Sequence, residues 1–197
     1  MKILIATNNS HKIKEIKGII SKKINFNIDF FTPADLKINI DPKETGTTFA
    51  ENAKIKAEAF YPLAKMPVLS DDSGLEVDFL GGAPGVSSAR FAESHNDAAN
   101  RKKLLKLLEN TEHRNARFVT VIAFYNSKDN NIYFFEGECK GEIIYQERGE
   151  GGFGYDSIFV PCGYDKTFAE LSEIEKNQLS HRADAVNKFC DFLAENL

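Results

Sequence analysis

The sequence has few cysteines and no long apolar run, and both features limit the kinds of protein that it can encode. The three cysteines, Cys139, Cys162 and Cys190, lie far apart. They lack the C-x-x-C spacing typical of zinc or redox sites, so we expect reduced thiols and a cytoplasmic protein. The apolar run from Ile3 to Ala6 is too short for the core of a signal peptide, and no apolar stretch reaches membrane-spanning length. We therefore expect no membrane partner.

A strong excess of charge of one sign is also missing. The formal net charge is -4, with 27% charged and 42% hydrophobic residues, values typical of a globular rather than a disordered chain. This balance, together with the lack of a stripe of basic and aromatic residues, argues against a nucleic-acid partner. The chain of 197 residues is long enough to bury a substantial core, and we expect a single domain over residues 1–197.

Apolar spacing predicts a mixed α/β domain. A short buried strand opens the chain, and a helix with Ser10 as its N-cap follows it. Thr48 and Glu51 fit the capping box of a second helix. Residues 97–109 form a third helix, and apolar residues at helical spacing predict a last one at the C-terminus. Residues 116–146 contain three stretches rich in β-branched and aromatic residues, which we expect to be three strands.

The stretch SDDSG, Ser70 to Gly74, contains two adjacent carboxylates, which repel each other. The main chemical question is what these two residues do at this position. On one interpretation Asp71 and Asp72 open a turn with Ser73, since Asp, Ser and Gly favour turns, and a lone motif of this kind favours that answer. On the other, the pair binds a divalent cation through its oxygens and one member activates a water molecule. The motif alone leaves both interpretations open.

Three further segments carry polar groups suited to a nucleotide. ATNNSHK, residues 6–12, lies between a strand and a helix, where backbone N–H groups and a lysine hold phosphate oxygens, although the spacing of a P-loop is absent. GEGGFGYDS, residues 149–157, is either a flexible turn or a loop whose aromatic ring stacks on a base and whose Asp156 reads the base edge. SHR, residues 180–182, begins a helix with donors suited to an anion or a base.

These motifs occur in an order that resembles one known family, that of the inosine triphosphate pyrophosphatases. The family is also called Ham1, or the noncanonical purine nucleoside triphosphate pyrophosphatases. Five segments carry the resemblance, from the first strand to the last helix: TNNSHK, ETGTTFAENAKIKA, SDDSGLEVDFLGGAPGVSSARF, GGFGYDSIFVP and KTFAELSEIEKNQLSHRADA. It implies an elongated, twisted mixed sheet with flanking helices, in two lobes around a nucleotide cleft, and a homodimer. The implied activity is Mg²⁺-dependent hydrolysis of ITP, dITP and XTP to the monophosphate and pyrophosphate, which would clean the nucleotide pool.

The resemblance implies a role for each matching residue. Asp72 matches the proton acceptor, and Asp72 and Glu44 match the acidic positions near the metal. Lys12, Lys56 and Arg182 would stabilise charge on phosphoryl oxygens, while hydrogen bonds to the 6-oxo group would select the purine. The positions that match substrate-binding residues are Thr7, Asn8, Asn9, Ser10, His11, Lys12, Lys56, Ser73, Phe153, Gly154, Tyr155, Asp156, Lys176, His181 and Arg182.

Three positions depart from the family pattern. Lys43 stands where the first of two acidic residues is common, which leaves Glu44 as the acidic residue there. Ser87 replaces a frequent aromatic residue and Ser157 a usual proline. Two other functions stay open: a Maf-like pyrophosphatase for modified pyrimidine nucleotides and a non-catalytic nucleotide sensor. The SHR segment and the GGFGYD loop favour the purine enzyme over the first, and a sensor would need no water-activating carboxylate.

Overall fold

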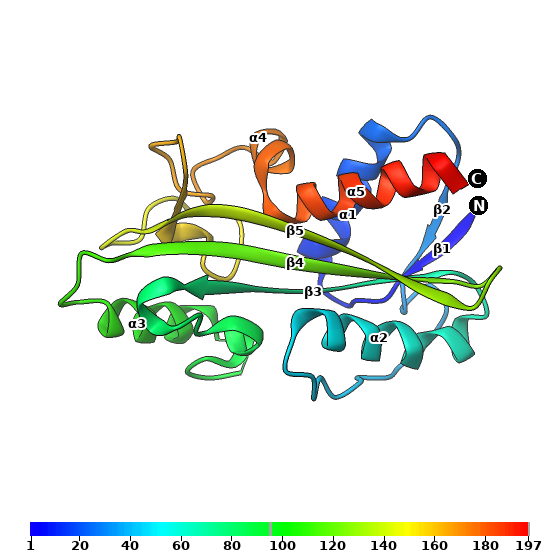
Figure 1. Ribbon diagram of the computed structural model, residues 1–197, viewed down its shortest axis with the longest axis horizontal. Coiled ribbons are helices and arrows are strands. Elements are labelled where there is room, and N and C mark those ends of the chain that lie inside the picture. Colours follow the sequence, from blue (N-terminus) through cyan, green and yellow to red (C-terminus); the bar gives the residue numbers. More distant parts are fainter. Residues whose placement is uncertain (95, 197) are drawn as a thin grey trace. The chain divides into compact units, whose positions relative to one another are not determined.

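The computed structural model describes residues 1–94 and 96–196 and has a mixed α/β fold (Figure 1). Within these residues the strands form a six-stranded sheet in the order β2-β1-β3-β4-β5-β6. Strand β1 pairs in parallel with β2 and β3, whereas β5 and β6 are antiparallel. The predicted class, a mixed sheet with flanking helices, is therefore confirmed.

The described chain contains strands, α-helices and short 3-10 helices. The strands are β1 (Lys2–Ile5), β2 (Asp29–Phe31), β3 (Val68–Val77), β4 (Asn115–Asn126), β5 (Asn131–Ile143) and β6 (Phe159–Pro161). The α-helices are α1 (Ser10–Lys23), α2 (Phe49–Ala64), α3 (Asp97–Leu107), α4 (Glu173–Leu179) and α5 (His181–Asn196). Short 3-10 helices are η1 (Asp78–Leu80), η2 (Gly85–Arg90) and η3 (Asp156–Ile158). In the part of the chain that the structure describes, none of these helices has both the length and the hydropathy of a membrane span.

The chain divides into two compact units. The first unit contains Met1–Asp72, Thr120–Gly137 and the residues from Arg182 onward, and the second contains Ser73–Val119 and Glu138–His181. Strands β3, β4 and β5 contribute residues to both units. The single domain over residues 1–197 stays a prediction, and each unit has a hydrophobic core of its own.

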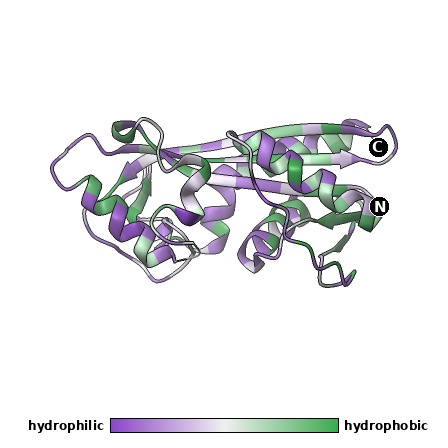
Figure 2. Ribbon diagram, turned by 90° about the horizontal axis from the view of Figure 1, so that it is seen from below, coloured by the Kyte–Doolittle hydropathy of each residue, from purple (hydrophilic) through white to green (hydrophobic). Residues whose placement is uncertain are grey.

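The first unit packs helices on both faces of its strands. Ile3 and Ile5 of β1 lie in one cluster with Ile16 of α1 and Phe189 of α5, whereas Leu4, between them, lies in a second cluster with α2. Successive strand residues point to opposite faces, so this alternation places α2 opposite α1 and α5, as Figure 1 shows. Figure 2 shows hydrophobic and hydrophilic residues alternating along the helices, as expected where one helix face packs on a sheet. Burial of a side chain such as Phe189 contributes about 2 kcal/mol.

Aromatic rings and α3 fill the core of the second unit. Leu75 of β3 and Leu104 of α3 are fully buried there. The ring of Phe118 on β4 meets that of Phe159 edge-on at 4.8 Å and stacks on that of Phe168 at 5.7 Å. Edge-on and offset stacked rings add to the stability that burial alone gives. Helix α3 is thus a fixed part of this unit.

Two details of the sequence prediction were wrong. Asn9, not Ser10, caps α1, because its Oδ1 accepts hydrogen bonds from the backbone N–H groups of His11 at 3.0 Å and Lys12 at 3.2 Å. The three strands predicted over residues 116–146 are two, since β5 continues to Ile143. Gly141 lies within β5 where a Cβ would collide with the backbone oxygen of Val160, so this glycine allows a close strand approach.

Two other details were right. Thr48 and Glu51 form the predicted capping box at the start of α2: the Thr48 hydroxyl accepts from the backbone N–H of Glu51 at 3.1 Å, and the Glu51 carboxylate accepts from the backbone N–H of Thr48. The third helix begins at Asp97 as expected, although it ends at Leu107 rather than residue 109. Sequence signals for helix starts were thus more reliable here than those for helix ends.

Candidate active site

The SDDSG segment lies inside β3, so the turn interpretation is wrong. Asp71 is 2% exposed and Asp72 6% exposed. The Ser70 hydroxyl donates to the backbone oxygen of Ala53 at 2.6 Å, which ties β3 to α2. Because neighbouring strand residues point to opposite faces, the two carboxylates are directed apart, and each has its own set of partners.

Asp71 faces the side of the sheet that α1 and α5 cover. Its Oδ2 pairs with Lys12 Nζ at 2.9 Å and with Arg182 Nη2 at 3.3 Å. Burial by itself would raise the pKa of Asp71, but the charges of Lys12 and Arg182 lower it well below the usual range. Arg182, 1% exposed, also donates to Glu15 of α1. Asp71 therefore stays ionised and holds two buried cations in place.

Asp72 faces α2. Its Oδ2 accepts a hydrogen bond from Asn52 Nδ2 at 3.1 Å, and its Oδ1 lies 3.6 Å from Lys56 Nζ. Burial raises the pKa of Asp72, since the lowering effects of Lys56 and Lys12 do not fully offset it, and the charge of Glu44 adds to the rise. A carboxylate with a raised pKa is the better proton acceptor of the two, which agrees with the predicted role of Asp72; that role stays a prediction.

Lys56 joins Asp72 to the predicted acidic position Glu44. Lys56 Nζ lies 2.8 Å from Glu44 Oε1 as well as near Asp72. Burial would lower the pKa of Lys56, but Asp72, Asp71 and Glu44 together raise it. We call six of these residues, all in the first unit, the carboxylate cluster: Lys12, Glu44, Lys56, Asp71, Asp72 and Arg182.

Asn52 is a member of this site that sequence reasoning missed. It is 0% exposed; its Oδ1 accepts from the backbone N–H of Gly46 at 2.8 Å while its Nδ2 donates to Asp72. Asn52 thus fixes the orientation of Asp72 and ties the loop near Glu44 to it. The available signal was the four-residue spacing from Asn52 to Lys56, which puts both on one helix face.

The predicted phosphate loop is the exposed connection from β1 to α1. Thr7 Oγ1 accepts from the backbone N–H of Asn9 at 3.2 Å, and the Asn9 side chain caps the helix. Asn8, Ser10 and His11 are exposed. The loop lies next to Lys12, so its polar groups flank the carboxylate cluster.

The second unit holds another group of predicted residues, which we call the loop cluster: Phe153, Asp156 and Lys176. Asp156 Oδ2 accepts hydrogen bonds from the backbone N–H of Phe153 at 2.9 Å and from Lys176 Nζ at 2.7 Å. Lys176 Nζ also lies 5.0 Å from the centre of the Phe153 ring. Asp156 and Lys176 are 3% and 6% exposed, so a buried ion pair lies beside an aromatic ring.

Four other predicted residues lie in the second unit near these elements. The Tyr155 hydroxyl donates to the backbone oxygen of Ser88 at 2.8 Å, and burial raises the pKa of Tyr155. The His181 ring stacks on Phe118 with ring centres 4.7 Å apart. Ser73 is half-buried on β3, and Gly154 has a φ of 62°, a left-handed conformation that suits glycine. Tyr155 and His181 therefore make structural contacts, and their predicted substrate-binding roles stay predictions.

The carboxylate cluster fits a divalent cation shared with a substrate. Glu44 and Asp72 both lie near one ammonium group, that of Lys56, so their oxygens converge on a position that a cation favours. Mg²⁺ is commonly bound by one or two carboxylates together with phosphate oxygens and water, rather than by an all-protein cage. Within residues 1–94 and 96–196, no group of three or more His, Cys, Asp or Glu side chains is placed to hold a metal.

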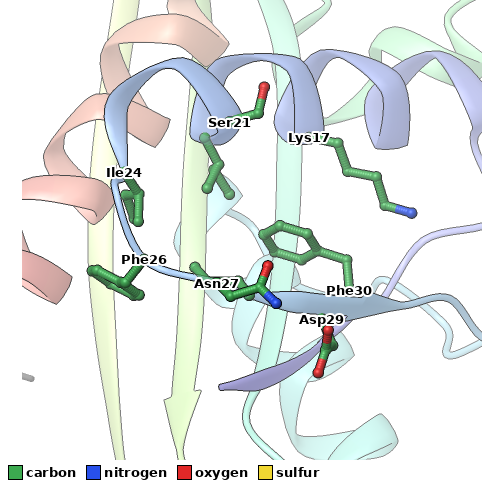
Figure 3. Close-up of a pocket in the computed structure, with 9 residues that line it drawn as sticks. Lys17, Ser21, Ile24, Phe26, Asn27, Asp29 and Phe30 are labelled. Atoms are coloured by element: carbon green, nitrogen blue, oxygen red, sulfur yellow. The ribbon is translucent and has the colours of Figure 1, made fainter.

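A cavity of about 580 Å³ lies beside α1, and none of the predicted site residues lines it (Figure 3). Its walls come from the second half of α1 and the segment that leads into β2. Apolar and polar side chains both line it: Lys17, Ile20, Ser21, Ile24, Phe26, Asn27, Ile28, Asp29 and Phe30. The chemistry of the predicted motifs therefore belongs to the two clusters and not to this cavity.

Comparisons with known proteins agree along the whole chain. Residues 3–192 match the model of the Ham1 family. A dITP/XTP pyrophosphatase of Aquifex aeolicus (strain VF5) is 46% identical over 203 residues, covering 98% of this chain and 96% of the relative. The Staphylococcus aureus Ham1 protein has a structure similar to this one, with a TM-score of 0.88 and 42% identity over 100% of both chains. A HAM1 protein from Coxiella burnetii gives a TM-score of 0.89 at 38% identity over 99% of both chains.

Proposed function

This chain belongs to the Ham1 family, and we propose on that basis that it hydrolyses noncanonical purine nucleoside triphosphates such as ITP, dITP and XTP to the monophosphate and pyrophosphate. Several curated relatives of nearly full coverage carry the name dITP/XTP pyrophosphatase. The single structural observation that carries the proposal is the buried Asp72, oriented by Asn52 and Lys56. Such a carboxylate is suited to take a proton from an attacking water molecule.

Positively charged side chains of this chain supply further electrostatic stabilisation of the reaction. Cleavage between the α- and β-phosphates builds negative charge on phosphoryl oxygens, which Lys12 and Lys56 are placed to stabilise. Asp71 holds Lys12 in position, and Arg182 acts through Asp71, with which its guanidinium is paired. Asp72 takes the proton of the attacking water, so that the new P–O bond forms as pyrophosphate leaves.

We propose Mg²⁺ as the cofactor, with Asp72 and Glu44 as the protein ligands. When bound, the ion would supply positive charge to the phosphate oxygens at the bond that breaks. Glu44 and Asp72 would then exchange part of their interaction with Lys56 for the cation. Activity should therefore be lost with a chelator and restored by added Mg²⁺.

The loop cluster is suited to choose the base. The Lys176 ammonium is a donor with no acceptor capacity, so it matches a 6-oxo oxygen and leaves the 6-amino group of adenine unpaired. The Phe153 ring offers a flat surface for the purine. Asp156 keeps Lys176 in place through their 2.7 Å contact, and His181 is proposed as a further donor to the base.

The same proposal covers assembly and location. We propose a homodimer, which light scattering on a sizing column would report as twice the mass of one chain. Because its substrates belong to the cellular nucleotide pool, we propose that the protein works in the cytoplasm. Neither a pyrimidine-specific Maf-like enzyme nor a non-catalytic sensor is favoured, since the curated relatives named above are purine triphosphate pyrophosphatases.

A substrate panel tests the proposal. The purified protein is incubated with Mg²⁺ and dITP, XTP, ATP, GTP or dTTP, and pyrophosphate and orthophosphate are measured separately. We expect pyrophosphate from dITP and XTP and little from the other three. Orthophosphate instead of pyrophosphate would overturn the bond assignment, and preference for dTTP would overturn the purine assignment. Saturable binding with no product would favour the sensor.

A further inference from the structure

Both backbone groups of Gly154 are held by side chains of α3. Asp97 Oδ2 accepts a hydrogen bond from the Gly154 backbone N–H at 2.7 Å. Arg101 Nη1 donates to the Gly154 backbone oxygen at 2.8 Å. Asp97 and Arg101 are four residues apart and so lie on one face of the helix, one turn from each other. The two side chains thus hold the backbone N–H and the backbone oxygen of the same residue, Gly154. We call Asp97 and Arg101 the α3 clamp.

The loop that contains Gly154 needs an external support. Gly149, Gly152 and Gly154 all have positive φ values, of 82°, 74° and 62°. Glycine loses more conformational freedom on folding than any other residue, so a loop rich in it holds its shape poorly without added contacts. A Cβ at Gly152 would collide with the Asp156 carboxylate, so this close turn also depends on glycine.

The clamped position lies between the residues proposed to contact the base. Phe153 precedes Gly154, and Asp156 follows two residues later; the Asp156 carboxylate bonds back to the Phe153 backbone N–H and to Lys176. A shift of the Gly154 peptide would therefore move the aromatic ring, the carboxylate and the lysine together. A displacement of such groups by about 1 Å is enough to weaken recognition of the base markedly.

Helix α3 is rigid enough to act as the support. Leu104 is fully buried in the core of the second unit. At the start of the helix the Asn100 side chain accepts from the backbone N–H groups of Ala92 at 2.7 Å and Glu93 at 3.1 Å. Groups held on a packed helix are positioned more accurately than groups on loops.

The clamp extends to one of the positions at which this chain departs from its family. Arg101 Nε donates to Glu147 Oε2 at 2.9 Å, and the Ser157 hydroxyl donates to the same oxygen at 3.0 Å. Ser157 stands where the family usually has proline, which has no donor to offer. The far end of the loop is thus connected to Arg101 through Glu147.

We propose that Asp97 and Arg101 are positioning residues for base selection: by fixing the Gly154 peptide they set the geometry of Phe153, Asp156 and Lys176 toward the 6-oxo purine. This inference rests on the proposed function, and it adds residues that make no contact with the base themselves. Their loss should raise KM and reduce discrimination between bases more than it lowers kcat, because the phosphate chemistry belongs to the carboxylate cluster.

The first test measures the clamp without any substrate. In Asp97→Ala and Arg101→Ala, hydrogen exchange at the Gly154 amide and its neighbours should become at least about tenfold faster, because a bond to a charged partner is lost. Asp97→Asn retains an acceptor oxygen and should stay close to wild type. The matched control is Lys102→Ala, which removes an exposed basic side chain one residue further along α3.

The second test measures selection. For the two alanine variants we expect KM for dITP to rise roughly tenfold, which corresponds to the loss of one charged hydrogen bond, while kcat changes less. The ratio of kcat/KM for dITP over dATP should fall, because dATP carries an amino group where dITP has the 6-oxo oxygen. Arg101→Lys keeps the positive charge but lacks the two separate nitrogens that reach Glu147 and Gly154, so it should fall between. Lower melting temperature with unchanged KM and ratio would overturn the inference, as would unchanged exchange at Gly154. Failure of wild type to hydrolyse dITP would overturn the proposed function, and the exchange result would still stand.

Discussion

The two aspartates of the carboxylate cluster have different partners and different pKa shifts. Asp71 and Asp72 are neighbours in sequence, but the strand directs them to opposite faces. Asp71 meets Lys12 and Arg182, and their charges keep its pKa low despite its burial. Asp72 meets an amide and a more distant ammonium, and burial leaves its pKa raised. One carboxylate can thus hold cations while the other accepts a proton.

Replacing Asn52 tests whether its hydrogen bond orients Asp72 for turnover. In Asn52→Ala, Asp72 loses its 3.1 Å hydrogen bond and its fixed direction, so we expect kcat to fall about 10- to 100-fold with a smaller change in KM. Pyrophosphate release under saturating dITP measures this. Lys54→Ala, an exposed position on the same helix, is the control and should keep wild-type kcat. An Asn52→Ala enzyme with unchanged kcat would contradict the assigned role.

Arg182 allows a test of the buried charges. Arg182→Met leaves the buried Asp71 and the half-buried Glu15 without their shared cation, so the free energy of unfolding should fall by about 3–5 kcal/mol. Urea denaturation measures the loss. On the same helix, Lys188→Met removes an exposed pair with Asp184 and should cost about 0.5 kcal/mol or less. Equal effects of the two changes would show that Arg182 is not held as described.

At the scale of elements, helix starts position most of the chemistry. Asn9 caps α1 just before Lys12, and Thr48 caps α2 just before Asn52 and Lys56. Helix α3 begins with Asp97, the first residue of the clamp. A helix whose first turn is fixed places the side chains of the next turn accurately. Capping residues are therefore part of the support for the carboxylate cluster.

Loss of the α2 cap should be measurable. Thr48→Ala removes the hydroxyl that accepts from the Glu51 backbone N–H, and the free energy of unfolding should fall by about 1 kcal/mol. Thr48→Ser keeps the hydroxyl and should remain within a few tenths of wild type, since both residues cap well. Thermal or urea unfolding of the two variants gives the comparison. An alanine variant as stable as the serine one would count against the cap.

For the whole molecule, acid should weaken the fold partly through Asp71. Its pKa is lowered in the folded state, so the unfolded chain binds a proton there first. The stabilisation is therefore complete above the ordinary aspartate pKa, about 4, and is lost as pH falls below that value. In Asp71→Asn the free energy of unfolding should fall less steeply between about pH 5 and pH 2. Urea titrations would contradict this role of Asp71 if the free energy of unfolding of Asp71→Asn fell as steeply with pH as that of wild type.

Much of this molecule was predictable from sequence, because the five motifs and their order indicate both fold and carboxylates. The turn at SDDSG was wrong because strand pairing and burial of Ser70 to Asp72 outweigh the local turn preference of these residues. Asn52 and Arg101 were missed for another reason. Their roles come from contacts with residues 20 and 53 positions away along the chain, which no local pattern records.

The most direct test of the central claim compares wild type with Asp72→Asn in parallel. Both are given dITP and Mg²⁺ while pyrophosphate release is followed, and dITP binding is measured by calorimetry with Ca²⁺ in place of Mg²⁺. We expect wild type to release pyrophosphate and the variant to lose at least about a thousandfold in kcat, roughly 4 kcal/mol of transition-state stabilisation, while it still binds dITP. A variant that retains wild-type turnover would contradict the account, because Asp72 would then not be the proton acceptor.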